Sequence, residues 1–137
     1  MVWVEHDYAT RKIMRADLTG ENPLELQKLF FGLPLYVIIN HSNSRVYWTD
    51  IHRSFTFIGS IGINGNHFRH EKSLHPTYFP FDLAISQNIF YWADQNLHGV
   101  SWFNQSSSSS VVNLQNLSPL DLIGVAISDS STQPIGI

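Results

Sequence analysis

A short aromatic phrase recurs along this chain at a fixed interval. The sequence VYWTD at residues 46–50 returns as FYWAD at residues 90–94, so Trp48 and Trp92 stand 44 residues apart. A step of 45 residues back from Trp48 reaches Trp3. Self-similarity at about 40–45 residues is typical of four-stranded propeller blades, in which each repeat is a sheet that packs against the next. The spacing therefore predicts an all-β propeller.

A second segment keeps the same offset. Residues 13–21 lie over residues 58–66 without a gap, and Gly20 meets Gly65. In the third repeat, residues 100–103 fill this place after a two-residue deletion. Two independent segments that share one offset support a common blade structure, so we expect about three blades.

A third segment sets the limits of the repeats. Residues 34–40 and 80–86 each precede an aromatic phrase, and residues 123–128 form another copy that no tryptophan follows. We therefore expect a partial propeller at 1–128, with repeats that start near residues 2, 46 and 90, and a tail or truncated next blade at 129–137.

Strand positions within a blade follow from its turn residues. Asn64-Gly65 is a strong hairpin signal, and it predicts a type I′ turn because both central positions need a positive φ. In the first repeat, residues 24–30 have helical propensity, but the repeat register favours an outer strand. The best-preserved repeat predicts strands at 35–40, 45–50, 55–63 and 67–72.

The composition suits a β protein with wide buried faces. Hydrophobic residues make up 43% of the chain, charged residues only 14%, and the net charge is −3. No Lys/Arg cluster offers a footprint for nucleic acid. The chain has no cysteine, which fits a cytosolic protein or an extracellular module with a large core. No apolar run reaches the ~18 residues of a membrane span, and the first residues lack the features of a signal peptide.

The aromatic phrases resemble a known repeat. Residues 47–50 match the YWTD motif letter for letter, and residues 91–94 match it in three of four positions. The chain is thus similar to the class B repeats of low-density lipoprotein receptors and their relatives. The resemblance implies a six-bladed ring, of which this chain holds about three four-stranded blades. It also implies flanking EGF-like modules in a single-pass surface receptor, although this chain contains no cysteine to form them.

The same resemblance implies a function. We expect a non-catalytic propeller segment of a lipoprotein-receptor-like protein, of the endocytic or Wnt co-receptor type, that needs no cofactor. Its partners would be protein ligands, such as a lipoprotein or a secreted signalling protein, and neighbouring receptor modules, with no nucleic acid and no membrane insertion by this segment. Its location would be extracellular, on a plasma-membrane or endosomal receptor. A structural matrix or adhesion propeller of the nidogen kind is the main alternative, and an enzymatic propeller is a more distant one.

The motif residues are expected to be structural. The tryptophans would fill space between blades, and Asp50 and Asp94 would accept backbone hydrogen bonds that hold neighbouring strands. Metal binding or catalysis by these acids is the less favoured alternative, because an acid repeated once per blade is expected of structure. The motif residues are Trp3, Tyr47, Trp48, Thr49, Asp50, Tyr91, Trp92 and Asp94.

The seven histidines form the next candidate group. Protonation of all seven would change the formal charge from −3 to +4, and imidazole is the side chain that titrates near endosomal pH. Residues 67–75 have a loose metal-ligand spacing, but no second ligand pair accompanies them, so solvated edge positions are favoured. We expect pH sensing, if present, from His52, His67, His70, His75 and His98.

The chain also has three glycosylation sequons and a run of serines. Asn40, Asn104 and Asn116 stand in Asn-X-Ser sequons, which permit N-glycosylation if the chain enters the secretory route. Serines 106–110 suggest a nucleophile by composition alone, but no Gly-X-Ser-X-Gly elbow surrounds them. The sequence therefore predicts no catalytic and no metal site.

Overall fold

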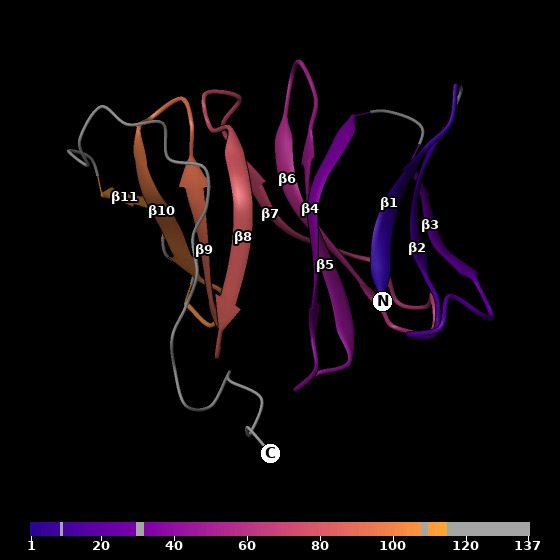
Figure 1. The fold of residues 1–137 in the computed structure, drawn as a ribbon. Coiled ribbons are helices and arrows are strands. Elements are labelled where there is room, and N and C mark those ends of the chain that lie inside the picture. The colour runs from indigo at the N-terminus through magenta and orange to yellow at the C-terminus, as the bar shows by residue number, and fades with distance from the viewer. Residues whose placement is uncertain (9, 30–31, 108–109, 115–137) are drawn as a thin grey trace. The chain divides into compact units, whose positions relative to one another are not determined.

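Strands alone make up the regular structure of the described residues. A computed structural model describes residues 1–8, 10–29, 32–107 and 110–114, and within these residues it contains eleven strands and no helix (Figure 1). The segment 123–128, expected to be a further first strand, lies outside the described residues, as does the whole expected tail at 129–137. The fold is all-β, and it is a partial propeller of antiparallel sheets.

The chain divides into two compact units, Met1–Tyr78 and Phe79–Ile137. The first unit contains a three-stranded and a four-stranded sheet, and the second contains one four-stranded sheet. Neighbours in each sheet are consecutive in the chain and antiparallel, as expected of blades. The first sheet comprises β1 (Val2–His6), β2 (Arg11–Arg15) and β3 (Leu24–Leu29); the second, β4 (Leu33–Asn40), β5 (Arg45–Ile51), β6 (Thr56–Gly62) and β7 (Arg69–Leu74); the third, β8 (Pro80–Ser86), β9 (Ile89–Asp94), β10 (Gly99–Asn104) and β11 (Val112–Leu114).

The offset between the repeats also appears in the way the strands pair. Trp3 in β1 pairs with Met14, and Trp48 in β5 pairs with Gly59, so each tryptophan is 11 residues from its partner. Trp92 in β9 pairs with Ser101, only nine residues away. The difference is the two-residue deletion inferred from the sequence.

Bulges also repeat between the sheets. The pairing of β2 with β3 shifts between Ile13 and Met14, and the pairing of β6 with β7 shifts between Ile58 and Gly59, again 45 residues on. A bulge inserts one unpaired residue and turns the strand. The first two sheets therefore share the same local twist, and residue positions in one correspond to positions in the other at an offset of 45.

The β6–β7 loop corrects the predicted turn type. The loop is closed by the N–H of Gly62, which donates to Asn66 O at 2.8 Å, and the N–H of Gly65 donates to Gly62 O at 2.8 Å. Gly65 has φ +80°, whereas Asn64 has no positive φ. Three residues thus form the loop, with glycine in the left-handed position, and the type I′ prediction is wrong. The loop Asp17–Glu21 has the same hydrogen bonds.

Strand limits differ slightly from expectation. The third strand of the second sheet spans Thr56–Gly62, and the outer strand begins at Arg69 instead of residue 67 because His67 has φ +54°. Residues Leu24–Leu29 form a strand, as the repeat register predicted over helix propensity, and Phe30 lies outside the described residues.

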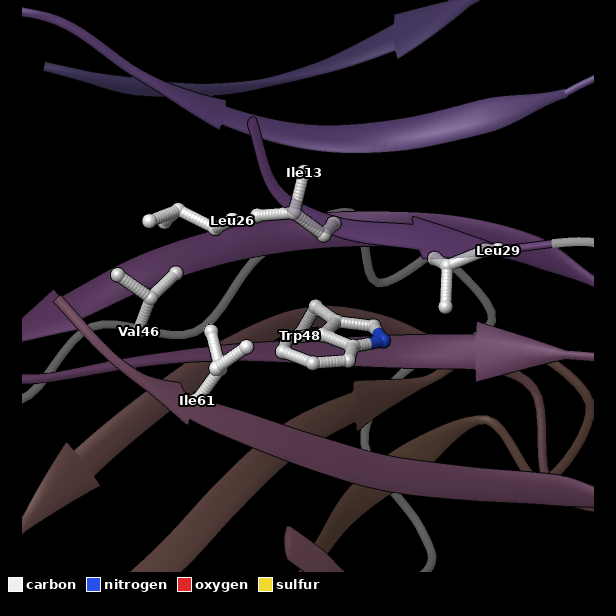
Figure 2. Close-up of a cluster of buried hydrophobic side chains, with 6 residues drawn as sticks. All are labelled: Ile13, Leu26, Leu29, Val46, Trp48 and Ile61. Atoms are coloured by element: carbon white, nitrogen blue, oxygen red, sulfur yellow. The ribbon is translucent and has the colours of Figure 1, made fainter. Parts of the chain in front are cut away.

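The core of the first unit lies between its two sheets. Ile13, Leu26 and Leu29 from the first sheet meet Val46, Trp48 and Ile61 from the second, and Figure 2 shows the Trp48 ring among these aliphatic side chains. Val2 and Val4 pack against the same cluster, so by strand alternation Trp3 lies on the other face of its sheet. Each sheet of this unit therefore buries one face by stacking on its neighbour, which is the propeller mode of stabilisation.

Candidate functional site

The motif tryptophans are at matched strand positions. Trp48 and Trp92 are fully buried, and Trp3 is half-buried. The indole N–H of Trp92 donates to Asp94 Oδ2 at 3.1 Å, whereas Trp48 Nε1 has no hydrogen-bond partner. The two copies of the motif are therefore not equivalent in their polar contacts.

Asp94 connects three parts of the second unit. Its Oδ1 accepts the N–H of Phe79 at 3.3 Å and the N–H of Leu97 at 3.0 Å. With the indole bond, the buried carboxylate has three donors. These bonds attach the residue before β8 and the β9–β10 turn to the motif strand.

Asp50 occupies the same motif position in a different environment. It is 1% exposed, and neither carboxylate oxygen has a hydrogen-bond partner of normal geometry. Burial raises the pKa of Asp50 to about 7, and the Arg11 guanidinium and the Leu33 N–H oppose this by smaller amounts. Arg11 itself donates to Gly32 O. A Cβ on Gly32 would overlap Asp50 Oδ1, so glycine is required where the chain passes the carboxylate.

The remaining motif residues have ordinary structural contacts. Thr49 Oγ1 donates to Leu35 O at 2.9 Å, which ties β5 to β4 beyond the backbone ladder. The Tyr47 hydroxyl accepts a hydrogen bond from Asn43 Nδ2 at 2.8 Å. Tyr91 in β9 pairs with Ala84 and with Trp102.

A polar network at the start of β5 was not anticipated from the sequence. Arg45 is buried, and its Nε and Nη2 donate to Ser60 Oγ at 3.0 and 2.8 Å. Nη2 also donates to His67 O at 2.7 Å, and Ser60 Oγ donates to Glu71 Oε1. The sequence feature that could have indicated this network is a basic residue at the start of the motif strand, because a buried guanidinium needs several acceptors.

Two of the candidate histidines take part in aromatic stacking. His52 stacks on Phe55 with ring centroids 4.5 Å apart, and His70 stacks on Phe57 at 4.8 Å. Phe55 and Phe57 are 6.1 Å apart, so the four rings form one series. We call His52, Phe55, Phe57 and His70 the aromatic–histidine row.

The structure does not bring the other histidines into this row. His67 and His98 are exposed and have left-handed backbone angles of +54° and +49°. His75 is exposed, and its Nδ1 lies 3.0 Å from Thr77 Oγ1. Among the described residues, no group of three or more His, Asp or Glu side chains could hold a metal ion.

Two of the three sequons lie at strand ends. Asn40 Oδ1 accepts the Ser42 N–H at 3.1 Å, and Asn104 Oδ1 accepts the Ser106 N–H at 2.9 Å. Both asparagines are half-exposed and end β4 and β10. Asn116 lies outside the described residues.

Comparison with known proteins supports the fold. The sheets and motif positions define a partial β-propeller of the YWTD type. No protein-family model matches the chain. A chain in the crystal structure of a nidogen/laminin complex resembles it with a TM-score of 0.68 and 18% identity over 85% of this chain. This chain spans 44% of that neighbour's length. In the part of the chain that the structure describes, no helix could cross a membrane.

Proposed function

We propose that this chain is a non-catalytic, protein-binding propeller segment of an extracellular protein. The observation that carries the proposal is the repeated blade with buried motif tryptophans, together with the resemblance to a chain of a protein–protein complex. Rigid sheets that present loops at their ends are well suited to protein recognition. The sequons Asn40 and Asn104, at strand ends, are consistent with a secreted protein.

Two forms of this function have separate support. The YWTD phrase supports a lipoprotein-receptor-like surface protein of the endocytic or Wnt co-receptor type. The name of the structural neighbour supports a matrix or adhesion propeller of the nidogen kind. In either form the motif residues are structural, and no residue of this chain is assigned a catalytic or cofactor-binding role.

Binding assays separate the two forms. Laminin and lipoprotein particles would be passed over the immobilised chain, and an unrelated protein of similar charge would serve as the reference. Saturable laminin binding supports the matrix form, and saturable lipoprotein binding supports the receptor form. Binding to neither, by a chain shown to be folded, would contradict the matrix form and the endocytic form of the receptor assignment.

Acid sensitivity is a further part of the proposal. We assign this sensitivity to His52, His67, His70, His75 and His98, because imidazole is in general the side chain that responds to pH between about 5 and 8. The affinity for whichever ligand binds would be measured at about pH 7.4 and at about pH 5.5. An unchanged pH dependence after replacement of these five histidines by glutamine would remove their proposed role.

A further inference from the structure

We propose that the open edge of β1 in one copy of this chain pairs with residues 122–128 of a second copy, and that the exchange is reciprocal. The two copies form a dimer in which each three-stranded first sheet gains a fourth strand. This inference goes beyond the proposed binding function and does not depend on which ligand the propeller takes. It rests on an unpaired strand edge in the structure and an unmatched strand sequence in the chain.

The first sheet leaves one strand edge open. Among the described residues β1 pairs only with β2, whereas β5 and β9 each have a neighbour on both sides. The Met1 amine donates to Ala16 O at 2.7 Å and the Ala16 N–H donates to Met1 O at 3.0 Å, so these two residues are a hydrogen-bonded pair. Because such pairs alternate along an antiparallel ladder, the backbone groups of Val2 and Val4 point to the open edge. An edge of this kind is a template for a further strand.

The other two sheets show which strand covers the equivalent edge. β4 covers β5 and β8 covers β9, and these covering strands contain the repeated segments 34–40 and 80–86. Residues 122–128, with the sequence LIGVAIS, align with both segments and share AIS with residues 84–86. They lie outside the described residues. The chain thus has three first-strand sequences and three described sheets, and the unmatched sequence corresponds to the sheet without a first strand.

The backbone of the two described first strands explains a glycine in the third copy. Both strands shift register at a bulge, which contains Tyr36 in β4 and Asp82 in β8. These residues have φ of +43° and +71°, angles that residues with side chains rarely adopt. The aligned residue in the third copy is Gly124, and glycine takes such angles without strain. The third copy is therefore well suited to the same bulged strand.

The repeat predicts the register of the exchanged strand. In the two complete sheets, the residue before the motif tryptophan pairs with Ile38 or with Ala84. The equivalent residues are Val2 in β1 and Ala126 in the third copy. Val2 and Ala126 therefore form a hydrogen-bonded pair, in which each N–H donates to the C=O of the other.

This register also brings apolar side chains together. The same alignment places Ile123 beside Val4, as it places Ala126 beside Val2. The two valines pack against the buried cluster between the first two sheets. Directly opposite residues of neighbouring strands lie on the same face, so the exchanged strand extends this cluster. Burial of apolar surface then adds to the backbone pairing as a driving force for association.

The short connections between sheets favour a second copy as the source of the strand. Residues 30–32 join β3 to β4 and residues 75–79 join β7 to β8, and each connection leads from one sheet to the next in chain order. Residues 115–121 form a similarly short connection after β11. Consecutive elements are usually adjacent in space, so the third copy begins a sheet that follows the third. In our proposal β1, β2 and β3 of another molecule complete that sheet.

Reciprocal exchange also limits the size of the assembly. Each chain has one unmatched first-strand sequence and one open β1 edge. Two chains that exchange their segments leave neither a free segment nor a free β1 edge. The contact is therefore the same on both copies, and assembly stops at a symmetric dimer.

Sedimentation velocity of the full chain tests the proposal, and we expect a dimer at micromolar concentration. The disrupting variant is Ala126→Pro, which removes the N–H that donates to Val2. Its matched control is Leu122→Pro, because Pro34 and Pro80 occupy this position in the two complete sheets. We expect at least about tenfold weaker dimerisation of Ala126→Pro, and dimerisation of Leu122→Pro close to that of the unaltered chain.

Introduced cysteines identify which chain supplies the strand. The chain has no cysteine of its own, and the register places Leu122 opposite Glu5, as Pro34 lies opposite Asp50. Chains that carry Glu5→Cys and chains that carry Leu122→Cys are unfolded together, refolded and oxidised. The control mixture replaces Glu5→Cys by Glu21→Cys, at an exposed loop position. We expect a disulfide between residues 5 and 122 of different chains, identified by mass spectrometry, and none in the control.

The proposal is overturned by a monomer at micromolar concentration, or by a dimer that both proline variants affect equally. An oxidised mixture without the disulfide between residues 5 and 122 also overturns it. If Ala126→Pro does not melt like the unaltered chain, the disulfide experiment decides alone. The laminin and lipoprotein assays are independent of these results, so failure of the exchange leaves the protein-binding function standing.

Discussion

Asp50→Asn is predicted to stabilise the protein at neutral and alkaline pH. The carboxylate is buried on the strand that carries Trp48, and neither of its oxygens has a hydrogen-bond partner of normal geometry. Asparagine has nearly the same shape and no charge. The substitution therefore removes the cost of a buried carboxylate while it changes the packing against Gly32 very little.

The magnitude follows from the shift in pKa. The pKa of Asp50 rises from about 3.9 in an unfolded chain to about 7 in the folded protein. Between these values the folded state binds more protons than the unfolded state, so the free energy of unfolding falls as the pH rises. At 1.36 kcal/mol per pKa unit, the loss reaches at most about 4 kcal/mol by pH ~8. This is a large part of the 5–15 kcal/mol typical of a domain.

The assay is urea unfolding followed by tryptophan fluorescence, at a series of pH values from about 4 to about 8. We expect Asp50→Asn to match the unaltered chain near pH ~4 and to exceed it increasingly toward pH ~8. Asp94→Asn is the matched control at the same motif position. Because Asp94 accepts three hydrogen bonds, one donor loses its acceptor, and the control should be destabilised by about 1–3 kcal/mol. A difference between Asp50→Asn and the unaltered chain that does not change with pH, or that shrinks as pH rises, would refute the reasoning.

Three further predictions concern Gly32, Trp48 and the two described sequons. Gly32→Ala should destabilise the first unit by more than the ~1 kcal/mol of a simple glycine effect, because φ is +97° and the new Cβ meets Asp50; urea midpoints measure this. Trp48→Ala should cost about 3–5 kcal/mol by the same assay, since the ring fills the core between the two sheets, and Trp48→Phe should cost less. In secretory expression, Asn40 and Asn104 should carry N-glycans, detected as mass shifts that glycosidase treatment and Asn→Gln variants abolish.

Much of the fold could be predicted from the sequence, because the information is local and repeated. The spacing of Trp3 and Trp48 predicted equivalent places for the two tryptophans, and the structure pairs each with a residue 11 positions on. The two-residue deletion predicted in the third copy agrees with the pairing of Trp92 with Ser101. Glycine at residues 20 and 65 predicted the two loops. The turn type at Asn64 was wrong because a loop's length depends on which flanking residues close it, and here Gly62 closes on Asn66.

The candidate site depended on contacts that the sequence does not encode locally. Asp50 and Asp94 share one motif position, but Asp94 accepts hydrogen bonds of normal geometry from residues 79 and 97. Asp50 lies against Gly32, and the nearby Leu33 N–H and Arg11 guanidinium only partly offset the effect of burial on its pKa. Likewise, the stacking of His70 on Phe57 arises because β6 and β7 pair across a bulge. The sequence determined which strands form and how they pair, since period and turn chemistry are short-range. Only the tertiary structure decided which buried carboxylate is satisfied and which rings meet, because both depend on groups that folding brings together from distant positions.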